Sequence, residues 1–262
     1  MRPRIRMWPD TFAWDIKAST YIGEKFKMLI LVPTPVGNLE DITLRAVQAL
    51  KDAGLILAED TRTSRKLLEH YQIKTPVQSF HAFNEHKTFM QYVEKMLNGE
   101  TIALISDAGT PGISDPGYLL IRECIHAGIR VTCLPGPTAF VPALVMSGLP
   151  CDRFYFEGFL PHKKGRKTRF EFLSKLDMTW ILYESPHRIK KCVEEICKFC
   201  GEDRPMAIVR EISKVYEEVI RGSAGMILEQ WKESGQKGEM VVVVGKYHEK
   251  ENQRSKTAMP DK

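Results

Sequence analysis

Polar side chains follow several short apolar runs of this chain of 262 residues, at places where strands of a sheet would end. Carboxylates and imidazoles at such ends can take a proton from a weak nucleophile, and arginine or asparagine can orient it. The sequence does not rank these candidates. The residues that we consider for catalysis are Asp60, Arg62, His81, Asn84, Glu85 and Glu184, together with the neighbouring Glu59 and His187.

Two of these residues also have a simpler interpretation. Asp60 precedes a helix-like run that begins at Thr61, so it is equally a candidate N-cap for that helix. His81 can be read as a partly buried polar residue. Both interpretations stay open at the level of the sequence.

Three loops that follow apolar runs are rich in glycine and proline. They are Pro33–Asn38, Ser106–Gly117 and Pro135–Thr138. Five of the twelve residues in 106–117 are Gly or Pro, which is typical of backbone that passes close to a ligand. Because open α/β sheets bind small molecules at strand–loop–helix junctions, three such loops predict a binding site. Tight turns without a ligand are the alternative for any single loop.

The loops lack the signatures of common phosphate sites. The chain contains neither GxGxxG nor GxxxxGK[ST], which argues against a dinucleotide or a nucleoside triphosphate. Pro135 and Pro137 offer carbonyl groups without competing N–H donors, so the loops suit a cation or an amine. The sulfonium and adenine amino group of S-adenosylmethionine (SAM) match this chemistry. The residues that we expect around such a cofactor are Pro33, Pro35, Gly37, Ser106, Asp107, Ala108, Gly109, Pro111, Pro135, Gly136 and Pro137.

Ten short strings of the chain, in order over residues 28–247, carry a resemblance. They are Pro33–Asn38 with Asp41–Thr43, Ala58–Arg62, Asn84–Glu85 after His81, Ser106–Pro111, Asp115–Tyr118, Pro135–Pro137, Glu157–Pro161, Tyr183–Ser185 with His187–Arg188, Arg210–Glu211, and Lys237–Glu239. On these strings the chain resembles the tetrapyrrole-methylase-type, or class III, SAM-dependent methyltransferases. It departs from longer relatives by lacking a C-terminal helical extension.

This resemblance implies a homodimer with SAM bound between two domains, Tyr183 near the cofactor, and the catalytic candidates lining the cleft. Within the family the chain is most similar to enzymes that methylate the ribose 2'-hydroxyl of a cytidine in 16S rRNA, in the decoding centre of the 30S subunit. One alternative is a methylase of the same fold that acts on a tetrapyrrole or another small molecule. Another is a ribosome-associated RNA-binding protein without catalysis.

A basic run indicates where RNA would bind. Residues 162–169 hold five Lys or Arg in eight positions, and a second cluster begins at Arg188. Such density suits phosphate neutralisation. A solvated surface loop is the alternative. The residues that we expect to contact RNA are Lys163, Lys164, Arg166, Lys167, Arg169 and Arg188.

Composition excludes several classes of protein. A hydrophobic content of 43% and a charged content of 27% are ordinary for a globular enzyme, and no apolar run is long enough to span a bilayer. Cys197 and Cys200 form a CxxC without a second ligand pair, so we expect buried thiols and no metal site. Reduced cysteines favour a cytoplasmic location.

The order of apolar runs predicts an α/β fold with two domains. We expect strands near 29–33, 55–58, 77–80, 101–105 and 129–134, alternating with helices near 41–53, 62–71, 86–98 and 117–127, which makes a parallel sheet covered on both faces. Asp41 is the expected N-cap of the first helix, with Leu44, Val47 and Leu50 on its buried face.

The second half predicts a mixed sheet with helices. Strand-like runs occur near 153–157, 179–183, 206–211, 216–221 and 239–245, and the two at 206–221 are joined too briefly for a helical crossover. We therefore place an N-terminal α/β domain at 28–137 and a C-terminal α/β domain at 138–247. Residues 1–27 are expected outside the core, since Met28 directly precedes the first strand, and 248–262 are expected to form a disordered tail.

Overall fold

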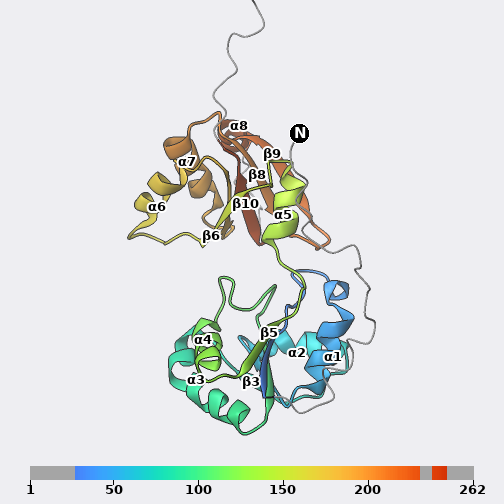
Figure 1. The fold of residues 1–262 in the computed structure, drawn as a ribbon. Helices are drawn as coiled ribbons and strands as arrows, with labels where there is room; N and C mark the ends of the chain where they lie inside the picture. The colour runs from blue at the N-terminus through green and yellow to red at the C-terminus, as the bar shows by residue number, and fades with distance from the viewer. Residues whose placement is uncertain (1–26, 231–237, 247–262) are drawn as a thin grey trace, which may run out of the picture.

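The computed structural model describes residues 27–230 and 238–246, without the side chains of 82–84 and 86–87. The predicted extension, apart from Lys27, and the predicted tail lie outside the described residues. Figure 1 shows the described chain as two α/β units, blue to green below and yellow to red above. None of the described helices is long and apolar enough to cross a membrane.

The first sheet is wholly parallel, with strand order β3-β2-β4-β1-β5. Its three central strands are rich in Leu, Ile and Ala because both of their faces are buried. The strands are β1 (Met28–Leu31), β2 (Leu55–Ala58), β3 (Val77–Ser79), β4 (Thr101–Ile105) and β5 (Arg130–Cys133). The predicted parallel sheet is confirmed.

Helices cover both faces of this sheet, as predicted. They are α1 (Leu44–Asp52), α2 (Thr61–His70), α3 (Ala82–Leu97) and α4 (Tyr118–His126), with a short 3-10 helix, η2 (Leu39–Asp41), before α1. Helices α1 and α2 pack through Leu50 and Leu67 on one face, and α3 and α4 pack through Met96 and Leu120 on the other.

The start of α1 differs from the prediction. Thr43 caps the helix, because its hydroxyl accepts a hydrogen bond from Ala46 N at 3.0 Å, whereas Asp41 lies in η2. The buried face therefore carries Ala46, Ala49 and Leu50, and Leu44 is 91% exposed. Helix α3 also begins four residues earlier than expected, which places Asn84 and Glu85 within its first turn.

The second sheet is mixed, with order β6-β7-β10-β8-β9. Only the β6–β7 pair is parallel, and the predicted antiparallel pairing of β8 with β9 is confirmed. The strands are β6 (Phe154–Phe159), β7 (Thr179–Glu184), β8 (Pro205–Arg210), β9 (Glu218–Ser223) and β10 (Met240–Val244). All strands of the first sheet precede residue 138 and all strands of the second follow it; that each half is an independent domain stays a prediction.

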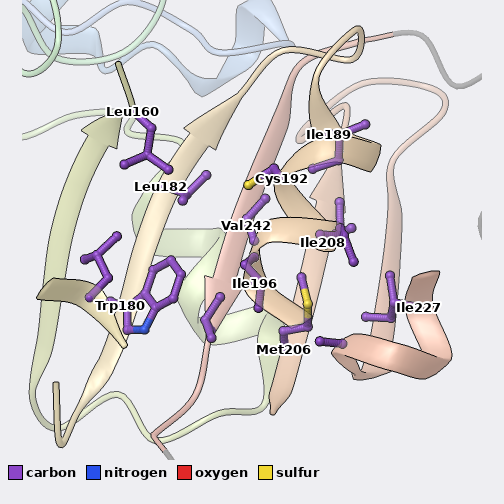
Figure 2. Close-up of a cluster of buried hydrophobic side chains, with 14 of the residues drawn as sticks. Leu160, Trp180, Leu182, Ile189, Cys192, Ile196, Met206, Ile208, Ile227 and Val242 are labelled. Carbon is purple, nitrogen blue, oxygen red and sulfur yellow. The ribbon is translucent and has the colours of Figure 1, made fainter. Parts of the chain in front are cut away.

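Alternation along the strands gives this sheet two apolar faces. Trp180 and Leu182 of β7 pack under helices α6 (Arg166–Leu173), α7 (Ile189–Cys200) and α8 (Ala224–Gln230) in the cluster that Figure 2 shows. Ile181 of the same strand packs against α5 (Phe140–Ser147) on the opposite face. Helix α5 ends at Gly148 in the left-handed conformation, with φ of 72°. The half-buried Cys197 and Cys200 pack against the core beneath α7.

Candidate functional site

A cavity of about 400 Å³ lies between the loops at the carboxyl ends of the first sheet and one end of the second sheet. Both halves of the chain contribute to its wall. The lining residues are Val36, Asp107–Thr110, Ile113–Asp115, Thr138–Phe140, Phe159, Tyr183–Pro186, Ile212 and Glu239–Val241. Its volume is in the range of small-molecule binding sites.

The three Gly/Pro loops meet at this cavity through hydrogen bonds. Thr34 and Gly109 exchange two backbone hydrogen bonds of 2.9 Å, which joins the loop after β1 to the loop after β4. The Thr110 hydroxyl donates to the Pro137 carbonyl at 3.1 Å and so joins the third loop. The Ser106 hydroxyl donates to the Gly109 carbonyl at 3.2 Å and fixes the turn between them.

Two glycines allow this close approach. Gly109 has φ of 84°, and a side chain there would begin 3.7 Å from Val36 Cγ1 and 3.9 Å from the Pro137 carbonyl oxygen. A Cβ at Gly136 would lie 2.7 Å from Pro33 Cβ. The glycines therefore bring backbone to the cavity where side chains would fill it or separate the loops.

The predicted cofactor residues divide into two groups. Asp107, Ala108, Gly109 and Tyr183 line the cavity. The other residues lie outside the lining, where Pro33, Ser106, Gly136 and Pro137 hold the loops together through the contacts above. The remaining predicted residues outside the lining are Pro35, Gly37, Pro111 and Pro135.

The charge of the lining is one-sided. Four carboxylates, Asp107, Asp115, Glu184 and Glu239, line the cavity, and its described lining contains no Lys, Arg or His. Burial, followed by the nearby Glu59 carboxylate, raises the pKa of Asp115 to about 7. Burial also raises the pKa of Asp107 and of Glu59. Arg166 and Arg188 already neutralise Glu184, and Lys214 pairs with Glu239, so the charge left for a ligand is that of Asp107 and Asp115. A cationic ligand would relieve the repulsion between these two carboxylates, so the lining suits a sulfonium or an ammonium group.

Aromatic rings form much of the wall from the second sheet. Tyr183 lies between Phe156 and Phe159, with ring centroids 5.2 and 5.3 Å apart, and Phe156 stacks on Phe140 at 4.6 Å. Burial raises the pKa of Tyr183 to about 12, so its hydroxyl stays protonated at neutral pH. Flat apolar walls of this kind hold an adenine ring well.

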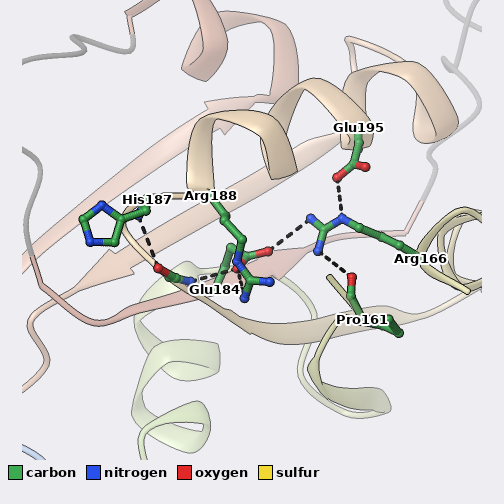
Figure 3. A network of polar contacts seen from close by, with 7 residues as sticks. Pro161, Arg166, Glu184, His187, Arg188 and Glu195 are labelled. Atoms are coloured by element: carbon green, nitrogen blue, oxygen red, sulfur yellow. Dashed lines mark hydrogen bonds and ion pairs between the residues drawn. The ribbon is translucent and has the colours of Figure 1, made fainter. Parts of the chain in front are cut away.

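Glu184 is the one predicted catalytic residue within the described lining, and it lies in the buried ion network of Figure 3. Its side chain is fully buried between Arg166 Nη2 at 3.1 Å and Arg188 Nη2 at 2.7 Å. Arg166 Nε also donates to Glu195 at 2.7 Å. Two guanidinium groups hold the Glu184 carboxylate in place. A carboxylate fixed in this way is suited to orienting the groups around it in the cavity wall.

The structure brings the other predicted catalytic residues near the loops but outside the lining. Asp60 caps α2 by accepting a hydrogen bond from Arg62 N at 2.8 Å, and the Arg62 side chain, itself 89% exposed, lowers the pKa of Asp60 to about 2. The buried Glu85 carboxylate accepts hydrogen bonds from Gly117 N and Leu119 N and so caps α4. These two carboxylates hold loops and helices in place, and their contact with substrate stays a prediction.

His81 and Asn84 stay predictions. His81 precedes α3 and lies near Glu59, whose pKa burial raises and whose interaction with His81 offsets that rise only in part. The Asn84 side chain lies outside the described residues.

The basic run divides into exposed and buried residues. Lys163 and Lys164 are exposed in the loop before α6, and the Lys167 side chain is 78% exposed on that helix. Arg166, by contrast, is 5% exposed and belongs to the Glu184 network, so its expected contact with phosphate was wrong. Arg169 pairs with Glu157 and Tyr155, and Arg188 is also engaged by Glu184.

Sequence reasoning missed much of the cavity wall. Asp115 was visible inside a string that carries the family resemblance, and Thr138–Phe140 directly follow another. Glu239 ends the string Lys237–Glu239, and Ile212 directly follows Arg210–Glu211. Met240 and Val241 carry no local signal, since strand pairing places them beside Glu184 and Tyr183.

The sequence model of the family described as Tetrapyrrole (Corrin/Porphyrin) Methylases matches residues 28–227. The chain belongs to this family. Curated relatives named ribosomal RNA small subunit methyltransferase I include one from Haemophilus influenzae, 48% identical over 221 residues, which cover 83% of this chain and 78% of that protein. Another, from Thermotoga maritima, is 42% identical over 216 residues, covering 82% of this chain and 97% of that protein.

Solved structures of family members share the fold. A diphthine synthase superposes with a TM-score of 0.66 at 14% identity, covering 83% of this chain and 90% of that one. A uroporphyrin-III-C-methyltransferase from Thermus thermophilus superposes with a TM-score of 0.59 at 19% identity, covering 84% and 94%. Family membership makes SAM the methyl donor, and the anionic, partly aromatic cavity accommodates its cationic and adenine groups.

Proposed function

We propose that this methyltransferase transfers a methyl group from SAM to the ribose 2'-oxygen of a cytidine in 16S rRNA of the small ribosomal subunit. The observation that carries the proposal is the cavity where three Gly/Pro loops meet, lined by four carboxylates and, within the described lining, by no cation. The relatives named for small-subunit rRNA methylation support the substrate class. The specific cytidine and oxygen rest on the strings that carry the resemblance.

In this proposal the chain contributes mainly orientation. SAM supplies an electrophilic methyl group, and holding it against a hydroxyl can account for much of the rate enhancement. Asp107 and Asp115 offset the positive charge of the cofactor, and the backbone at Gly109 approaches it closely. Glu184, fixed by two arginines, orients polar groups of the bound molecules.

Asp115 is the lining carboxyl best suited to accept the proton of the ribose hydroxyl. With a pKa of about 7 it is ionised in part at neutral pH and still basic enough to bind a proton. Asp60 and Glu85 are already engaged in capping helices.

The exposed lysines give the RNA a place to bind. Lys163, Lys164 and Lys167 follow the cavity-lining residue Phe159 closely in the chain and are exposed. Their charges would neutralise phosphates next to the acceptor nucleotide.

Assembly and location complete the proposal. We place the protein in the cytoplasm as a homodimer. All six cysteines are free, which suits a reducing compartment. Val215 and Leu44 are 93% and 91% exposed and offer apolar surface to a second copy.

Transfer of labelled methyl groups from SAM to small subunits that lack the modification tests the proposal. We expect label in 16S rRNA at one cytidine, in a dinucleotide that resists alkaline hydrolysis because its 2'-oxygen is blocked. Transfer should persist in excess EDTA provided that the subunits stay intact, because displacement of a methyl group from a sulfonium needs no metal ion to generate the nucleophile. Label in a tetrapyrrole but not in RNA, or binding of subunits without transfer, would replace this function by one of the alternatives.

A further inference from the structure

Phe159 is an aromatic residue of the cavity wall that lies largely uncovered. It is 56% exposed, although it lines the cavity. One neighbour is Tyr183, at 5.3 Å between ring centroids, and Tyr183 continues to Phe156 and Phe140. Phe140 in turn contacts Phe154 at 6.2 Å, so a row of five rings runs from Phe154 to Phe159.

A bulge in β6 sets the direction of this ring. The pairing of β6 with β7 shifts register between Phe156 and Gly158, where one extra residue is inserted. Gly158 has φ of 73°, and a Cβ there would lie 2.8 Å from Ser114 Oγ. Bulges change the direction of the side chains that follow, and this one needs glycine at its turn. The exposed ring of Phe159 thus results from specific backbone geometry.

Cations follow directly after the ring. Leu160 is buried and anchors the strand end, and the exposed His162, Lys163 and Lys164 come next. Lys163 lies four positions after Phe159 in the chain, which spans at most about 14 Å when extended. An aromatic face and phosphate-binding cations at this separation are the combination that binds unpaired nucleotides.

We propose that Phe159 stacks on the base of the nucleotide whose ribose is methylated. This inference rests on the proposed function and adds a residue that positions the substrate. A nucleotide that leaves its stack to bring its ribose to the cavity loses stacking energy, and an aromatic face in the site compensates for that loss. The ring can stack on any unpaired base, whichever of the four it is. The ring therefore positions the ribose and contributes little to sequence specificity.

Direct binding of unmethylated small subunits, measured without SAM, tests the stack independently of catalysis. We expect Phe159→Ala to weaken binding about 10-fold or more, because loss of a base–aromatic stack has effects of this size. Phe159→Trp should restore binding. Phe154→Ala is the matched control, since Phe154 lies on the same strand, is 40% exposed and is absent from the cavity lining.

Two further measurements separate the possible occupants of the ring face. Calorimetric titration with SAM alone should give the same affinity for Phe159→Ala and the unmodified protein, and the KM for subunits should rise more than kcat falls. Weaker SAM binding in Phe159→Ala would show that the ring faces the adenine and would overturn the inference. Unchanged subunit binding would overturn it as well. Absence of methyl transfer by the unmodified protein would instead reject the proposed function, while the binding result would still decide the stack.

Discussion

The two walls of the cavity are built in different ways. The wall from the first sheet is mostly backbone, held by the hydrogen bonds between Thr34, Gly109, Thr110 and Pro137. The wall from the second sheet is mostly side chains, and among them Glu184 is held by the buried Arg166 and the half-buried Arg188. Close approach of backbone requires glycine at defined points, whereas a side-chain wall requires charge pairs and strand register. The two walls should therefore fail differently when they are altered.

The largest expected effect is on the stability of the side-chain wall. Glu184→Ala leaves Arg166, 5% exposed, with one fewer buried carboxylate partner and removes the partner of Arg188. Breaking a buried ion pair from one side costs about 3–5 kcal/mol of the free energy of unfolding. Urea denaturation measures this loss. Glu239→Ala, a lining carboxylate whose side chain is 74% exposed, should cost less than about 1 kcal/mol, and an equal loss for both variants would contradict this account.

When the backbone wall is altered, the loss of its ligand should come in addition to the strain that any side chain meets at positive φ. Gly109→Val places a branched side chain at φ of 84° beside the cavity, so we expect SAM binding to fall at least about 100-fold in calorimetric titration. Gly128→Val is the control, because Gly128 has φ of 67° and a Cβ there would meet no atom within 4 Å. Normal SAM affinity in Gly109→Val would remove this loop from the site.

The difference between a backbone wall and a side-chain wall also explains how well the sequence predicts each of them. The Gly/Pro loops and the buried strands before them are local patterns, so the parallel sheet and the meeting of three loops were predictable. The burial of Arg166 was not, since its partners Glu184 and Glu195 lie 18 and 29 residues away. Glu85 reads as a catalytic carboxylate because the N–H groups that it caps lie 32 and 34 residues further along. Among these residues, only the capping role of Asp60 was predictable from neighbouring residues, because Asp60 directly precedes α2.

The basic run provides a further comparison, between exposed and buried cations. Replacing Lys163, Lys164 and Lys167 with Gln should reduce the slope of log affinity for RNA against log salt by about 0.7 for each phosphate that is no longer neutralised. SAM affinity should not change. Arg166→Met should leave the slope as it is and lower stability instead, because this guanidinium is buried. Filter binding at several salt concentrations measures the slope, and an unaltered slope in the triple lysine variant would make these residues plain solvated surface.

The smallest effect that we expect is a pH dependence from Asp115. Its pKa is about 7 in the folded protein against 3.8 for the free side chain, so the folded state binds the proton more tightly. Stability from this group is therefore lost as pH rises from about 4 to 7. Asp115→Asn is uncharged at every pH and does not lose this stability. The melting temperature of the variant minus that of the unmodified protein should therefore be larger at pH 8 than at pH 5.5. Thermal unfolding at the two pH values gives the answer, and a constant difference would contradict the assignment.

Gly37 has a consequence for how far the cavity can change in size. A Cβ at this position would collide with the Ile212 carbonyl and would lie 2.6 Å from Lys214 Cγ. The loop after β1 thus rests directly on the turn that carries Ile212, itself part of the cavity wall. Any side chain at residue 37 would act as a wedge that moves the two sheets apart. The spacing between the walls is therefore set by contact between main chains, and exchanging lining side chains can alter the chemistry of the cavity without altering its width.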